Sequence, residues 1–169
     1  MKSIILLISL FSSSAFALDL NVDIENGPLG VSWGATEKEI IATLGEPNGH
    51  FILSKNRKII YYGKKISLFL KRGKLNEIMF TSHADYSLSS VPVVMNSNYD
   101  KAMITINGKR VIGMPFDDVA DALNMEFGAP GYHVELATDN ADINLHFSSS
   151  TIDEAKSYTL HMFKIKHVH

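Results

Sequence analysis

The chain has 169 residues, of which 46% are hydrophobic and 20% charged, with no cysteine and a formal net charge of −2. Without cysteine, a disulfide-held scaffold and a metal site with thiolate ligands are excluded. The hydrophobic content argues against intrinsic disorder, and 16 basic against 18 acidic residues disfavour a nucleic-acid-binding domain of the basic type. What remains is a globular protein large enough to have a core of its own.

Residues 1–17 have the three-part pattern of a secretory signal peptide. Lys2 gives a positive start, residues 3–11 are mostly apolar, and Ala15 and Ala17 are the small residues expected before a cleavage site. We therefore expect cleavage after Ala17 and export, to the periplasm in a Gram-negative bacterium. The apolar run is too short to span a bilayer, and no cysteine follows it, so we expect neither a membrane span nor a lipid anchor.

The rest of the chain shows an internal repeat with a spacing of about 80 residues. Its landmarks are Gly27, Gly34 and Pro47, which recur in the same order as Gly108, Gly113 and Pro130 at offsets of 81, 79 and 83 positions. This spacing predicts a first repeat unit over residues 18–81, a connector over 82–102 and a second unit over 103–169.

The first unit reads as a short strand, a helix and three further strands. Thr36 and Glu39 form a capping box that starts the helix, and Gly45 with Pro47 ends it. Residues that follow directly, from Asn48 to Phe51, are expected to form a loop. The predicted strands span 20–24, 59–62, 66–70 and 75–80, with turns over 63–65 and 71–74.

The second unit repeats this order. Pro115 suits the first turn of a helix, whose apolar face comprises Phe116, Val119, Ala120 and Leu123 and which we expect to close at Gly128. The predicted strands span 103–106, 132–136, 143–147 and 158–165. The expected fold class is α+β, with two tandem units that each have a helix followed by about three antiparallel strands, and with the helices packed on one face of the sheet.

One pattern resembles a known superfamily. It runs Gly34-x-Thr36-x-x-Glu39-Ile40, then Leu44-Gly45-x-Pro47, then Tyr61-Tyr62-Gly63 and Leu68 to Phe80. It is similar to the superfamily of the β-lactamase inhibitory protein and the outer-membrane lipoproteins of the SmpA/OmlA type. The resemblance implies tandem helix-plus-sheet repeats in an exported binding module. The chain departs from it by lacking the lipidated cysteine of the lipoproteins and the disulfides of the inhibitor.

Aromatic residues are the candidates for binding a partner, because Trp and Tyr are favoured anchors at interfaces. Tyr61 and Tyr62 are neighbours on a predicted strand and point to opposite faces, so we expect one of them to be exposed. The resemblance adds the loop after the first helix, which the inhibitory relatives use to reach their target. The candidate partner-binding residues are Asn48, His50, Phe51, Tyr61, Tyr62, Tyr132 and His133.

Positive charge is concentrated in the first unit. Residues 55–74 contain eight Lys or Arg residues and no acid. This cluster could steer an acidic partner or an anionic envelope surface. The alternative is that these lysines serve to solubilise turns and protect strand edges.

The histidines give a weak indication of a metal site. His167 and His169 would point to the same face of a strand, His161 shares that parity, and the remaining candidate ligand is His146. The alternative is that they are polar residues of a solvated strand and terminus. No cofactor is predicted, and no motif for nucleophilic or zinc-dependent hydrolysis occurs.

We therefore expect an exported, non-catalytic protein-binding module. Its most concrete form is an inhibitor or immunity protein that neutralises an enzyme or toxin. Two alternatives stay open: an accessory factor in cell-envelope or outer-membrane assembly, and a metal- or small-ligand-binding module.

Overall fold

The computed structural model describes residues 20–82, 93, 95–149 and 158–168. The predicted signal peptide with its cleavage after Ala17, much of the connector and His169 lie outside the described residues.

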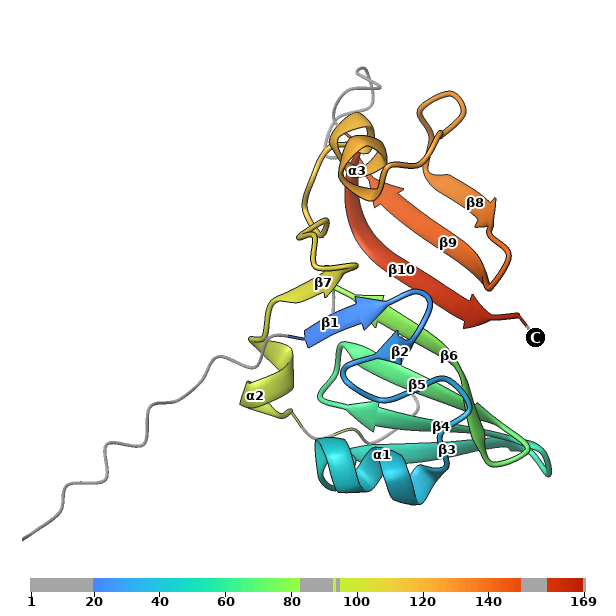
Figure 1. Ribbon diagram of the computed structural model, residues 1–169. Helices are drawn as coiled ribbons and strands as arrows, with labels where there is room; N and C mark the ends of the chain where they lie inside the picture. Colours follow the sequence, from blue (N-terminus) through green and yellow to red (C-terminus); the bar gives the residue numbers. More distant parts are fainter. Residues whose placement is uncertain (1–19, 83–92, 94, 150–157, 169) are drawn as a thin grey trace, which may run out of the picture.

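Seven strands form one antiparallel sheet in the order β3-β4-β5-β6-β10-β9-β8 (Figure 1). The two parts of the chain meet at its middle, where β6 pairs with β10 and Ile78 lies opposite Ile165. This pairing leaves β3 and β8 as the two edges. The strands are β3 (Gly49–Ser54), β4 (Arg57–Tyr62), β5 (Ile66–Lys71), β6 (Lys74–Thr81), β8 (His133–Ala137), β9 (Ala141–Ser148) and β10 (Thr159–His167).

A small second sheet has the order β2-β1-β7 and lies between α1 and α3 in Figure 1. Its strands are β1 (Leu20–Asp23), β2 (Gly27–Pro28) and β7 (Ile104–Ile106), and β1 pairs with β7 in parallel. The helices are α1 (Glu37–Leu44), α2 (Ser97–Asp100) and α3 (Phe116–Leu123).

The expected fold class is wrong, because the protein is mostly β. Strands account for 46% of the structure and helices for 15%. The helices are at most eight residues long among the described residues, and the small sheet supplies part of the covering layer that was expected from helices. The strands also do not form two separate helix-plus-sheet units, since β6 pairs with β10 to make one continuous sheet.

The core lies on one face of the seven-stranded sheet. Across five neighbouring strands, fully buried aliphatic side chains stand opposite one another, namely Ile60, Leu68, Ile78, Ile165 and Ile143. Residues of α1, α3, β1 and β7 pack against this row, among them Ile40, Val119, Val22 and Ile106. Side chains alternate along each strand, so the residues next to this row point to the other face of the sheet.

The segments before α1 and α3 bond to the sheet in the same way. The amide of Gly34 donates to the Leu75 carbonyl (2.9 Å), as the amide of Gly113 does to the Leu160 carbonyl (2.8 Å). Leu75 and Leu160 in turn each donate an amide hydrogen to the residue that follows the glycine. Both glycines have positive φ, +77° and +82°, which a residue without Cβ adopts readily.

Local signals at the helices are partly confirmed. The capping box is present, with the Thr36 amide donating to the Glu39 carboxylate (2.7 Å) and the Thr36 hydroxyl accepting from the Glu39 amide. The predicted closure of α3 at Gly128 is wrong: the helix ends at Leu123, and Asn124 caps it in the left-handed conformation. Asparagine tolerates this conformation better than most residues other than glycine. The expected loop after α1 is instead strand β3.

Candidate functional site

Three of the candidate binding residues are structural. Tyr61 and Tyr62 are both buried, so the expectation that one of them is exposed is wrong. The Tyr62 hydroxyl donates to the carbonyl of Gly45 at the end of α1 (2.8 Å), and burial raises the pKa of this tyrosine. Asn48 uses its side-chain oxygen to accept from the Gly63 amide (2.7 Å) and so fixes the connection into β3. Strand β4 lies inside the sheet and is buried on both faces, which the adjacent tyrosines alone could not reveal.

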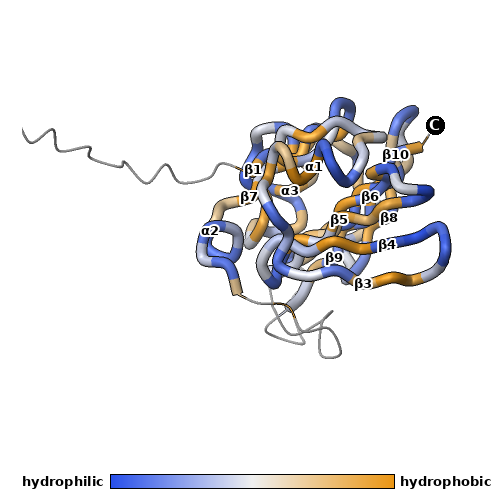
Figure 2. The backbone as a smooth tube through the Cα atoms, turned by 90° about the horizontal axis from the view of Figure 1, so that it is seen from below, coloured by the Kyte–Doolittle hydropathy of each residue, from blue (hydrophilic) through white to orange (hydrophobic). Residues whose placement is uncertain are grey.

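Exposed apolar side chains gather on the edge strand β3. Phe51, Ile52 and Leu53 are consecutive and are 42%, 67% and 43% exposed. His50, another candidate, is also exposed. Figure 2 shows this apolar strand at the outside of the molecule, next to the hydrophilic turn that joins it to β4. Ile52 and Leu53 are not among the predicted binding residues, although an apolar run between Gly49 and a polar turn is a signal for a strand.

The two remaining candidates lie at the opposite edge, beside β8. Tyr132 is 61% exposed and makes an edge-to-face contact with Tyr158, with 4.7 Å between ring centroids. His133 stacks on His146 (4.4 Å between centroids), and its Nε2 lies 3.2 Å from the Asn144 Oδ1. The seven candidates therefore do not form one site: they divide between the β3 edge, the β8 edge and the buried part of β4.

Positive charge lies at one end of β3. The β3–β4 turn and the β5–β6 turn are neighbours there, because the Arg72 amide donates to the Asn56 carbonyl (2.7 Å). Lys58 is paired with Glu37 of α1 (2.7 Å). The other exposed cations of these turns form no ion pair with an acid in the part of the chain that the structure describes: they are Lys55, Arg57, Lys71, Arg72 and Lys74.

A shallow pocket of about 220 Å³ connects the apolar and the cationic parts of this edge. Ile52 and Leu70 contribute apolar atoms to its lining, and Lys55, Arg57 and Lys58 border it. The β3 edge therefore presents apolar surface, an indentation and unpaired positive charge next to one another. We call Phe51, Ile52 and Leu53 with the two cationic turns the β3 edge site.

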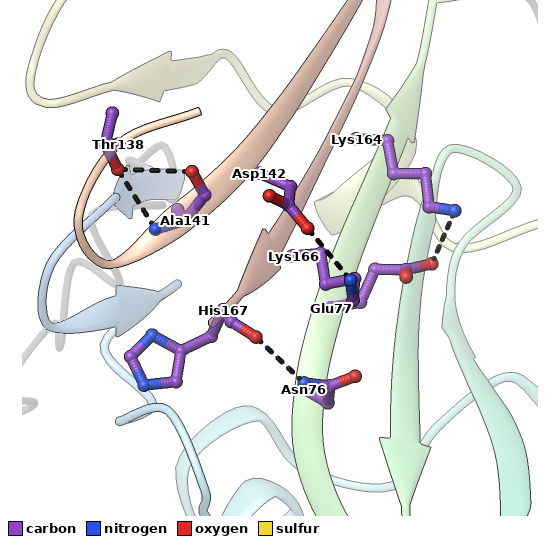
Figure 3. Close-up of polar contacts among 8 residues, drawn as sticks. All are labelled: Asn76, Glu77, Thr138, Ala141, Asp142, Lys164, Lys166 and His167. Carbon is purple, nitrogen blue, oxygen red and sulfur yellow. Dashed lines mark hydrogen bonds and ion pairs between the residues drawn. The ribbon is translucent and has the colours of Figure 1, made fainter. Parts of the chain in front are cut away.

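The charges at the middle of the sheet are, by contrast, paired with one another. Lys166 lies 2.9 Å from Asp142, and Lys164 lies 3.2 Å from Glu77, whose side chain is almost completely buried (Figure 3). Two cations that each lie close to a carboxylate leave little net electric field to attract a charged partner. The exposed cations of the two turns at the β3 edge, in contrast, form no ion pair with a described acid and are available to attract one.

The histidines that the structure describes do not gather into a metal site. A register shift between Leu160 and Met162 interrupts β10 at His161, so the strand does not keep the parity from which a common face was inferred. His167 stacks on Trp33 (5.6 Å between centroids), whereas His161 lies near enough to His146 to help lower its pKa, after the larger effect of burial. Among the described residues, no three His, Asp or Glu side chains are arranged to hold a metal ion.

No family model, no characterised protein and no solved structure matches this chain. The resemblance to the superfamily of the β-lactamase inhibitory protein therefore stays a prediction from the residues that carry it. Within the described ranges, no helix is long and apolar enough to cross a membrane.

Proposed function

We propose that the protein is an exported, non-catalytic protein-binding module that acts as an inhibitor or immunity protein, and that it contacts its target through the β3 edge site. The observation that carries the proposal is the exposure of Phe51, Ile52 and Leu53 on an edge strand. Export is supported by the signal-peptide pattern of residues 1–17.

The chemistry of the β3 edge site favours a macromolecular target over a small ligand. Small-molecule sites are enclosed cavities of about 300–1,000 Å³ that cover most of their ligand. The pocket at this edge is about 220 Å³ and shallow. Interfaces between proteins, in contrast, combine an apolar centre with a polar rim, and here the three apolar side chains adjoin the cationic turns.

Site-specific cross-linking in living cells tests this proposal. A photoreactive amino acid replaces Ile52 in the exported protein, and a matched control carries it at Ala137, which is exposed on the other edge strand. We expect a protein to be cross-linked from position 52 and not from position 137, and the purified chain to reduce the activity of that protein. Identical cross-links from both positions, or none from either, would contradict the proposal.

A further inference from the structure

The backbone of β3 is available for pairing. In an antiparallel ladder, alternate residues of a strand direct their N–H and C=O groups away from the neighbouring strand. β3 has β4 on one side and no described strand on the other. Its pairing with β4 is regular from Gly49 to Ile52 and shifts only between Ile52 and Ser54. A stretch of edge backbone long enough to pair with an added strand is therefore present.

The opposite edge shows how an edge strand is protected in this fold. On β8, Val134 and Leu136 point towards the core, and the exposed positions carry His133 and the charged Glu135. Charged side chains on an edge oppose the addition of another strand. β3 carries no charged residue over its six positions, and none of them is buried. The protection found at β8 is thus missing at β3.

Apolar side chains flank the free edge on both faces of the sheet. Phe51 stands opposite Ile59, and Ile52 stands opposite Lys58, whose next partner across the sheet is Leu70. Because successive side chains alternate, Phe51 and Ile52 lie on different faces. A strand added along β3 would find an apolar neighbour for its own side chains on either face.

We infer that the β3 edge accepts an extended, acidic segment of the target protein as an additional antiparallel strand; this rests on the proposed function and adds the mode of binding and the chemistry of the partner. The direction follows the seven-stranded sheet, in which every pairing is antiparallel. β3 runs towards the cationic turns, so the N-terminal part of an antiparallel segment meets Lys55 and Arg57. Acidic residues are expected there.

Two other occupants fit the observations less well. A lipid surface would bury the outward N–H and C=O groups of β3 without partners, at a cost of several kcal/mol for each group. A second copy of the chain would also pair these groups, but in an antiparallel pairing its β3, which has no acidic residue, would lie beside Lys55 and Arg57 and leave them without an acid. An acidic strand satisfies the backbone and neutralises the cations at once.

The test uses a synthetic peptide of about seven residues, with three N-terminal glutamates followed by alternating valine and threonine. Its affinity is measured by calorimetry, and exchange of the β3 amides is followed by NMR. Controls are the same peptide with lysines in place of glutamates, and the peptide N-methylated at alternate residues in either register. Protein variants are Ile52→Lys, Phe51→Thr as a second edge variant that keeps a strand-forming residue, and Ala137→Lys as the control on β8.

We expect slowed exchange of the outward amides of β3, and binding that is about tenfold weaker with Ile52→Lys, with lysines in the peptide, or with one N-methylated form. Ala137→Lys should bind like the parent. Equal binding of both N-methylated peptides, or no binding at all, overturns strand addition. If the peptide fails to bind and the protein forms a dimer that Ile52→Lys abolishes, the edge is assigned to a second copy. If instead the protein sediments with phosphatidylglycerol vesicles and Ile52→Lys abolishes this, the edge is assigned to lipid. If strand addition fails but a target protein is still cross-linked from position 52, the proposed function stands and only the mode of binding is overturned.

Discussion

The hydroxyl of Tyr62 should stabilise the end of α1, and its removal gives a defined test of the fold. The last carbonyls of a helix have no partner within the helix. Here Tyr62 donates to the carbonyl of Gly45, and Tyr99 donates to the carbonyl of Leu44. The ring centroids are 5.0 Å apart, so Tyr62 of β4 and Tyr99 of α2 fasten the same end of α1, one to the sheet and the other to α2.

The expected cost of Tyr62→Phe is about 1 kcal/mol. A typical internal hydrogen bond contributes about 0.5–1.5 kcal/mol, and a group left unpaired in the interior costs more. Gly45 is exposed, so water can replace the hydroxyl at its carbonyl and the cost stays within this range rather than above it. Tyr62→Ala also removes a fully buried ring and should cost about 3–5 kcal/mol.

Urea unfolding measures these differences, with the fluorescence of Trp33, the single tryptophan, as the signal. Tyr61→Phe is the matched control, because Tyr61 is a buried neighbour on the same strand whose hydroxyl donates no hydrogen bond to a described residue. It should change the free energy of unfolding by less than about 0.5 kcal/mol. Equal effects of the two Phe substitutions, or a cost below 1 kcal/mol for Tyr62→Ala, would refute the role assigned to Tyr62.

Three further predictions concern stability and are checked by urea unfolding. Gly34→Ala and Gly113→Ala should each cost about 1–2 kcal/mol, because a Cβ meets no atom within 4 Å and only the positive φ is unfavourable; clearly unequal costs would contradict this. Burial lowers the pKa of His146 below 6.5, so the neutral ring's contribution to the free energy of unfolding is present above that pH and is lost as the pH falls. His146→Gln should therefore lessen the loss of stability between pH 7.5 and 5, and an unchanged dependence of stability on pH would contradict this. Lys164→Met leaves the buried carboxylate of Glu77 without its cation and should cost about 2 kcal/mol of stability. Adding Glu77→Gln should restore part of this loss, and no recovery in the double variant would contradict the pairing.

The strands of hairpins could be predicted from local sequence, whereas the joining of the sheet could not. The strands β4, β5 and β6 are confirmed to within a few residues, because short polar turns with glycine separate apolar runs. The pairing of β6 with β10 and the parallel pairing of β1 with β7 join segments about 80 residues apart. Nothing in the local pattern of either segment specifies its partner.

The site was harder to predict than the strands, for two physical reasons. β3 has no buried position, so it lacks the alternation of inward and outward residues by which a half-buried strand is recognised. In β4 the opposite holds, since Ile59 to Tyr62 are buried on both faces and the tyrosines carry no sign of it in their spacing. The sequence therefore favours a loop for His50 and Phe51, where the structure has a strand.

The stability of the fold does not explain the apolar residues of β3. Side chains that are 42–67% exposed bury little area, and surface substitutions of this kind usually change the free energy of unfolding by less than about 0.5 kcal/mol. An exposed apolar edge also favours self-association, which β8 avoids with His133 and Glu135. The proposed binding of a target at this edge would account for a feature that contributes little to folding and carries this liability. Under the same proposal, the cations beside Phe51 and Ile52 that form no ion pair with a described acid favour an acidic target.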